Sequence, residues 1–243
     1  PSHEVDALLH RVEDRFSRAV QVDPSRASAH TSLSHLHLNA GRFAQAKLSA
    51  ERAYRADPFL ENANLTLWRL YQASWNLGDA VEARRACDEG QRRFHGDFRF
   101  VQCQLMSMGF PGSAPDVQRA WALADTFTTW SPPQVRDVNR LRGQMYVAMA
   151  LVRAGLADSA RAVASRSRSD PFQDPLREIP FMESIVLGWV GEADEAVEQL
   201  ESYLAASPGE LETYRRQASR GGLPWYHVDL LEEPAFRSLV GIR

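Results

Sequence analysis

The chain has 243 residues, of which 44% are hydrophobic and 24% charged, so its composition is that of a folded protein and not of a disordered tail. A formal net charge of −3 argues against direct nucleic-acid binding, and no apolar stretch is long enough for membrane insertion. Lys47 is the only lysine, so all the other positively charged side chains are arginines.

An internal repeat appears near the N-terminus. The segment FSRAVQVDP returns in outline as AERAYRADP, and the closing prolines, Pro24 and Pro58, are 34 positions apart. Between the two prolines, the apolar spacing predicts a helix over residues 26–39 and a second helix over residues 43–56. Gly41 supplies the left-handed conformation that ends the first helix, and Pro58 stops the second. A period of this length, built from two helices, indicates a helical repeat protein.

Small residues and turn residues carry a resemblance to a known family. Gly41, Ala46, Ala53 and Pro58 stand where paired helices would turn, cross and end. On these positions the sequence resembles the tetratricopeptide repeat (TPR) family. The resemblance implies an all-α fold, a right-handed α-solenoid of antiparallel helix hairpins with about 12 to 13 helices.

Further turn glycines extend the repeat along the chain. Gly78, Gly155 and Gly191 each mark the turn of a later hairpin, and one divergent unit fits between the first two of these glycines. Because hairpins that cannot bury their apolar faces alone must stack, we predict a single solenoid domain over the whole chain, residues 1–243. It would comprise a half repeat, five repeats of which the third is the divergent one, and a C-terminal capping segment: 1–24; 25–58, 59–96, 97–131, 132–171 and 172–208; and 209–243.

The two ends differ from the complete repeats. Residues 3–22 predict one amphipathic helix that fits the second half of a repeat, which suggests a chain cut from a longer protein. Near the C-terminus, the run LLEEPAFRSLV resembles the closing segment of bacterial repeat proteins whose repeats follow a serine/threonine kinase, a cyclase or a transcriptional regulator. We expect apolar side chains here to cover the last open helix face: Trp225, Leu230, Phe236 and Leu239.

The sequence lacks the common signatures of catalysis. It contains no glycine-rich phosphate loop, no His-Glu-x-x-His zinc motif and no Gly-x-Ser-x-Gly elbow, so we predict no enzyme, no catalytic residue and no cofactor. His30, His35 and His37 share one helix, but their spacing does not suit zinc, and we predict no metal site. Cys87 and Cys103 are expected to be reduced, buried thiols, although a contact between them is conceivable.

The resemblance also implies where a partner would bind. In TPR proteins the first helix of each repeat lines a concave groove, and fixed positions on that helix point inward. Aromatic, methionine and arginine side chains are enriched in binding surfaces, although the same tryptophans would pack in the core if the alignment were shifted by one position. The inward positions carry the candidate partner-binding residues of the groove: His35, Asn39, Trp68, Gln72, Trp75, Arg142, Met145, Met149, Arg153, Phe181 and Trp189.

These observations predict a non-catalytic scaffold that binds a peptide or partner domain in its concave groove, in bacterial signalling or regulation. The alternative is a sensory or regulatory region of a larger kinase, cyclase or transcriptional regulator, which binds a ligand or forms homo-oligomers. An enzyme on an all-helical scaffold is a third, less favoured reading. We expect a protein or peptide partner and a cytoplasmic location, or an extracytoplasmic one if a membrane segment lies upstream.

Overall fold

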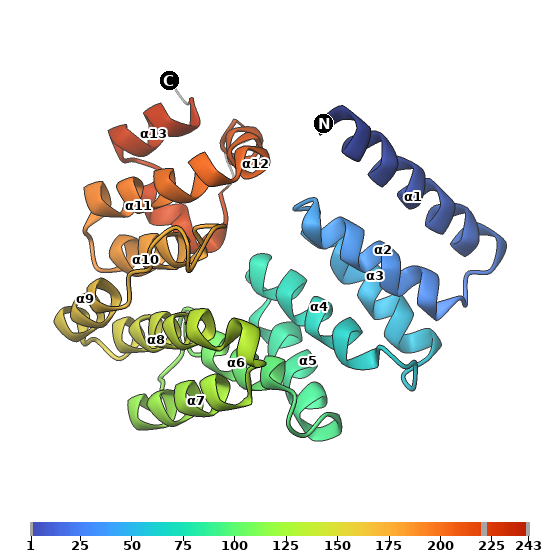
Figure 1. The fold of residues 1–243 in the computed structure, drawn as a ribbon, viewed down its shortest axis with the longest axis horizontal. Coiled ribbons are helices and arrows are strands. Elements are labelled where there is room, and N and C mark those ends of the chain that lie inside the picture. The colour runs from blue at the N-terminus through green and yellow to red at the C-terminus, as the bar shows by residue number, and fades with distance from the viewer. Residues whose placement is uncertain (1, 220–222, 242–243) are drawn as a thin grey trace. The chain divides into compact units, whose positions relative to one another are not determined.

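All regular elements in the described part of the chain, residues 2–219 and 223–241 of a computed structural model, are helices (Figure 1). They fall into two units, residues 1–95 and residues 96–243. The first unit contains five α-helices: α1 Ser2–Val22, α2 Ala27–Asn39, α3 Phe43–Ala56, α4 Ala63–Asn76 and α5 Ala80–Arg93. The second contains eight α-helices and two short 3-10 helices: α6 Phe98–Ser107, α7 Val117–Trp130, η1 Pro133–Val135, α8 Arg136–Arg153, α9 Ala157–Arg166, α10 Glu178–Trp189, α11 Ala193–Ala206, α12 Pro208–Ala218, η2 Trp225–Leu230 and α13 Pro234–Val240.

In the first unit, consecutive helices pack against each other as hairpins. α2 pairs with α3 and α4 with α5, while α2 also contacts α4 and α1 covers α2. The helices approach closely because side chains at their crossings are small, and Ala46, Ala50 and Ala73 are fully buried. α2 and α3 end at the predicted residues, which confirms the hairpin that the repeat indicates.

Glycines end the first helix of each of these hairpins. Gly41 and Gly78 have positive φ angles of 65° and 72°, which glycine adopts without strain. The N–H groups of Arg42 and Asp79 then donate to carbonyls five residues earlier, at 2.8 and 2.9 Å, as in a Schellman motif. Asp79 also accepts a hydrogen bond from Nζ of Lys47 at 2.6 Å, so the turn of one hairpin is tied to α3 of the other.

The second unit follows the same plan. α6 packs against α7, α7 against α8, α8 against α9, and α10 against α11. α6 and α7 both lie within residues 97–131, the range predicted for the divergent repeat. Gly143 lies where α8 packs on α7, and a Cβ at this position would be 3.4 Å from Cβ of Ala124.

The C-terminal helices close the second unit. Leu230 and Phe236 are buried in one hydrophobic cluster with side chains of α11 and α12, and Leu239 packs against that cluster. These three residues confirm the expected capping role. Trp225 differs from the expectation, because it packs against α10.

The cysteines also differ from the expectation. Cys87 and Cys103 are both buried, as predicted, but both are disulfide-bonded and the described part of the chain holds no free cysteine. The prediction of reduced thiols is therefore wrong. A disulfide requires sulfur atoms within bonding distance and a suitable dihedral angle, which are properties of packing that sequence spacing does not reveal.

Candidate functional site

Four of the predicted partner-binding residues lie on neighbouring helices of the first unit. His35 and Asn39 are exposed and one turn apart on α2, while Trp68 and Gln72 are half-buried and one turn apart on α4. Nδ2 of Asn39 lies 3.4 Å from Nε2 of His35, and the Trp68 ring stacks on Tyr71 with ring centroids 5.5 Å apart. The surface formed by His35, Asn39, Trp68 and Gln72 is called the α2–α4 face below.

Polar contacts hold α4 against α2. The hydroxyl oxygens of Thr31 and Thr66 are 3.0 Å apart and buried, and Nη1 of Arg69 donates to the Thr31 carbonyl at 3.2 Å. Partial burial, and then repulsion by Arg69, lower the pKa of His35. The imidazole is therefore neutral at pH 7. The α2–α4 face offers uncharged hydrogen-bonding groups beside an aromatic ring.

A cavity of about 380 Å³ adjoins this face at Asn39. Leu9 of α1 and Leu36 of α2 contribute apolar lining, and a two-pronged ion pair from Arg42 to Glu13, at 2.8 and 2.6 Å, contributes polar lining. The hydrogen bonds from Arg42 hold the pKa of Glu13 below its usual range, so the pair stays ionised at neutral pH. The cavity can take an apolar side chain next to a polar surface.

Three of the predicted residues lie in the core. Trp75 on α4 is 5% exposed, and Met145 and Met149 on α8 are 0% and 1% exposed. The two methionines are buried because α8 is packed against α6, α7, α9 and α10. Their side chains support the helices and do not reach the surface where a partner would bind.

The two predicted arginines of α8 are engaged within the second unit. Arg142 forms an ion pair with Glu178 at the start of α10. Nε of Arg153 donates to the Gly109 carbonyl at 2.8 Å, and its guanidinium carbon lies 3.9 Å from the centre of the Trp189 ring. Burial lowers the pKa of Arg153. Both arginines therefore already have partners in the chain itself.

The C-terminal segment covers the predicted residues of α10. Trp225 stacks on both Phe110 and Trp189, with ring centroids 5.4 and 5.7 Å away. The indole N–H of Trp189 donates to the backbone carbonyl of Tyr226 at 3.1 Å, and Phe181 meets the Tyr226 ring edge-on at 5.8 Å. These five residues are called the α10 aromatic cluster below. Phe181 and Trp189 thus bind residues of their own chain.

His227 joins the C-terminal segment to α10 and α12 by hydrogen bonds. It is 1% exposed, and its ring nitrogens lie 2.9 Å from Oγ of Ser184 and 2.8 Å from the hydroxyl of Tyr214. Because Oγ of Ser184 donates its own proton to the Phe181 carbonyl at 2.7 Å, Nε2–H of His227 donates to Ser184 and Nδ1 accepts from Tyr214. Burial lowers the pKa of His227 to about 3.

Ser184 and His227 are close enough to act as a nucleophile and its general base. However, the Ser184 hydroxyl donates its proton to the Phe181 carbonyl, and Nε2 of His227 donates to Ser184 instead of accepting from it. Ser184 and His227 are both buried, so no substrate could reach them. Elsewhere in residues 2–219 and 223–241, no three His, Cys, Asp or Glu side chains are grouped so as to hold a metal ion. None of the described helices has the length and apolar character needed to cross a membrane.

Sequence reasoning did not find Phe110, Tyr226 and His227, and it placed Trp225 in the terminal cap. The aromatic run at Trp225 and Tyr226 is a signal that could have suggested a second packing surface. Phe110 sits in the loop between α6 and α7, where no helical periodicity marks it. Its contact with Trp225 depends on the path of the chain and is not encoded by local pattern.

Comparison with solved structures identifies the fold. A thermophilic TPR protein from Thermus thermophilus has a similar crystal structure, with a TM-score of 0.55 and 16% sequence identity. The match covers 79% of this chain and 97% of that one. No family model and no curated protein matches the sequence. The structural likeness confirms the predicted all-α, TPR-like solenoid.

Proposed function

We propose that this chain is a non-catalytic scaffold that binds an extended peptide of a partner protein on the α2–α4 face of its first unit. One observation carries the proposal. The predicted partner-binding residues of α2 and α4 other than Trp75 are exposed or half-buried, and their recorded contacts are with residues of their own helix. On α8 and α10, by contrast, Met145 and Met149 are buried, and the half-buried arginines and aromatic residues are bound by other segments of the chain. The regulatory setting in a bacterium rests on the resemblance of the closing segment.

The chemistry of the face suits a peptide backbone. Asn39 and Gln72 carry amides that both donate and accept hydrogen bonds, and the neutral His35 can do the same. An extended peptide presents alternating N–H and C=O groups that match such side chains. The Trp68 ring, held by its stacking on Tyr71, supplies apolar contact at low entropic cost.

The adjoining cavity would supply side-chain selectivity. Its volume of about 380 Å³ and its lining by Leu9 and Leu36 suit one apolar side chain of the peptide. The ionised Glu13–Arg42 pair in the same lining disfavours burial of a single charge there. We therefore propose an extended peptide with an apolar residue next to polar neighbours.

The test is a peptide selection followed by titration calorimetry. Peptides selected from a random library would be titrated into the wild-type protein and into Trp68→Ala combined with Gln72→Ala. We expect binding to the double variant to weaken at least about tenfold, since an aromatic anchor and a hydrogen-bonding group are lost.

The control is Trp130→Ala combined with Gln134→Ala, because both residues are exposed and lie outside the α2–α4 face. Circular dichroism would establish that each variant is folded. Equal affinity of the Trp68/Gln72 variant and the wild-type protein would overturn the proposed site.

We also propose an extracytoplasmic location. Disulfides persist in oxidising compartments and are rare in the cytosol, so the disulfide-bonded state of Cys87 and Cys103 supports this location over the cytoplasmic one. Cells would be lysed under denaturing conditions in the presence of an alkylating reagent, and the protein would then be weighed by mass spectrometry without reduction. No alkylation is expected, whereas a doubly alkylated protein would contradict the proposal.

A further inference from the structure

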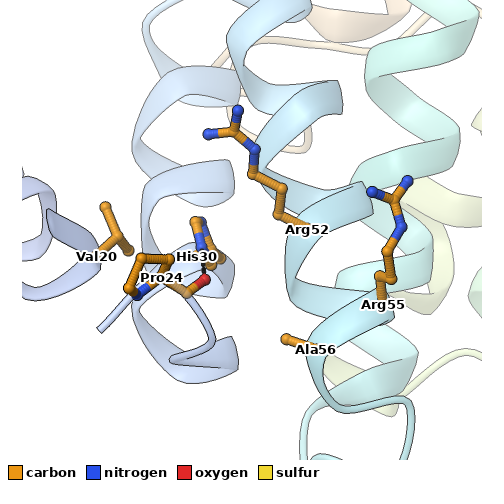
Figure 2. Close-up of a pocket in the computed structure, with 6 residues that line it drawn as sticks. All are labelled: Val20, Pro24, His30, Arg52, Arg55 and Ala56. Carbon is orange, nitrogen blue, oxygen red and sulfur yellow. Dashed lines mark hydrogen bonds between the residues drawn. The ribbon is translucent and has the colours of Figure 1, made fainter. Parts of the chain in front are cut away.

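A second cavity of the first unit lies apart from the α2–α4 face. Its volume is about 490 Å³, and three helices and one turn contribute to its lining: α1 with Val20, the following turn with Pro24, α2 with His30, and α3 with Arg52, Arg55 and Ala56. Figure 2 shows both arginine side chains extending from α3, and the hydrogen bond that joins His30 to Pro24. These six residues are called the arginine cleft below.

The positive charge of the cleft is not neutralised within the described chain. Neither Arg52 nor Arg55 forms an ion pair with a described acidic side chain. Asp23, beside Pro24, accepts hydrogen bonds from the backbone N–H and the hydroxyl of Ser25 at 3.0 and 2.7 Å. Glu51, next to Arg52 in sequence, lies 3.8 Å from Nζ of Lys47, and Asp57, two residues after Arg55, accepts a hydrogen bond from the backbone N–H of Phe59 at 2.9 Å.

The neighbouring hairpin shows what an internally balanced version of the same surface looks like. Counting from the turn glycines Gly41 and Gly78, the positions on α5 that correspond to Arg52 and Arg55 are Glu89 and Arg92. Glu89 and Arg92 form an ion pair with each other. Two arginines three residues apart on a helix instead repel each other, and a bound anion would remove that repulsion.

The rest of the cleft is formed by the hydrogen-bonded His30 and by apolar side chains. His30 is buried, and its Nε2 lies 2.9 Å from the Pro24 carbonyl, which fixes the turn that forms one wall. Val20 and Ala56 add aliphatic surface. The site therefore combines two charged groups that have no internal acid with a wall that suits the methylene groups of a longer side chain.

We propose that the arginine cleft binds an acidic segment of a partner protein, with carboxylates on Arg52 and Arg55 and aliphatic carbons against Val20 and Ala56. Guanidinium groups match carboxylates in shape as well as charge, because each can donate two parallel hydrogen bonds. A glutamate side chain supplies both the carboxylate and the methylene groups that the cleft requires. This site does not depend on the α2–α4 face.

Titration calorimetry with a capped peptide of alternating glutamate and leucine tests the proposal, with the matching glutamine–leucine peptide as the uncharged probe. We expect the acidic peptide to bind the wild-type protein, the uncharged peptide not to bind, and Arg52→Gln combined with Arg55→Gln to weaken binding at least about tenfold. Trp68→Ala combined with Gln72→Ala should leave acidic-peptide binding unchanged.

The matched control is Arg84→Gln combined with Arg140→Gln, which removes the same charge from two exposed arginines outside the cleft. This variant should bind the acidic peptide as the wild-type protein does. The proposal is overturned if the acidic peptide does not bind, if the Arg52/Arg55 variant binds it equally well, or if the control variant loses as much affinity, since that would indicate general charge attraction.

Discussion

α4 of the first unit and α10 of the second are both first helices of a hairpin, and aromatic residues stand at predicted partner-binding positions on each. Trp68 on α4 is half-buried and stacks only on Tyr71 of its own helix among the ring pairs described. Trp189 on α10 is also half-buried, but it stacks on Trp225, lies under Arg153 and donates to the Tyr226 carbonyl. The same residue type on the same kind of helix is thus available for binding in one unit and is used for internal packing in the other.

The difference between the two helices lies in the chain that follows them. After α12, the C-terminal segment returns to α10 as η2 and places Trp225, Tyr226 and His227 on it. Among the described elements of the first unit, α4 packs mainly against α2, α3 and α5. A predicted binding residue is therefore a candidate only where no later segment of the chain covers it.

The largest effect is expected at the centre of the α10 aromatic cluster. Trp225→Ala removes the stacking on Phe110 and Trp189 and should lower the free energy of unfolding of the second unit by about 3 kcal/mol. Urea denaturation followed by circular dichroism measures the loss. Trp130→Ala, at a tryptophan that is 47% exposed, should change stability by less than about 0.5 kcal/mol. Equal effects of the two substitutions would show that the C-terminal segment does not stabilise α10.

Low pH should also destabilise the packing of the C-terminal segment on α10, because His227 becomes protonated on unfolding. The pKa of His227 is about 3 in the folded protein and about 6.5 when unfolded, so the unfolded state takes up the proton first as pH falls. The stability is fully present above about pH 6.5 and declines toward pH 3, with a loss of roughly 2 kcal/mol at pH 5.

Urea denaturation at pH 7.5 and pH 5 would measure this loss. His227→Gln removes the titrating group, and its pH-dependent loss should be smaller than that of the wild-type protein by about the amount assigned to His227. An unchanged pH dependence in the variant would contradict the assignment.

Arg153 should contribute a smaller amount. Arg153→Met keeps the aliphatic bulk but removes the hydrogen bond to Gly109 and the cation–π contact with Trp189, at an expected cost of about 1 to 2 kcal/mol. Thermal and urea unfolding of this variant and of Arg84→Met, at an exposed arginine, provide the comparison. If both variants were as stable as the wild-type protein, Arg153 would be free to serve a partner.

The smallest stability effect is expected on the α2–α4 face. His35→Ala combined with Asn39→Ala removes two exposed side chains and should change the free energy of unfolding by less than about 0.5 kcal/mol. Urea denaturation would measure this change, and titration with a selected peptide should show weaker binding. A large loss of stability would show that these residues act in packing.

Much of the fold can be predicted from the sequence, because local chemistry determines it. Gly41, Pro58 and the buried alanines near helix crossings specify a hairpin without reference to the rest of the chain. The candidate site is less predictable. Helical position alone does not separate the buried Met145 from the exposed His35, because burial depends on which helices pack on each side.

The covering of α10 depends on a contact between residues that are far apart in sequence. Trp225 meets Phe110 across more than a hundred residues, and neither residue carries a local signal of that contact. The disulfide-bonded state of Cys87 and Cys103 is likewise not predictable from local sequence, because a buried cysteine has the same sequence pattern whether it is a thiol or part of a disulfide.

Hydrogen exchange with and without a selected peptide tests most directly whether partner binding uses the first unit. We expect slower amide exchange in α2 and α4, with no change in α8, α10 and η2. Slower exchange in α8 and α10, accompanied by faster exchange in η2, would mean that the peptide displaces the C-terminal segment. That result would contradict the assignment of the binding site to the α2–α4 face.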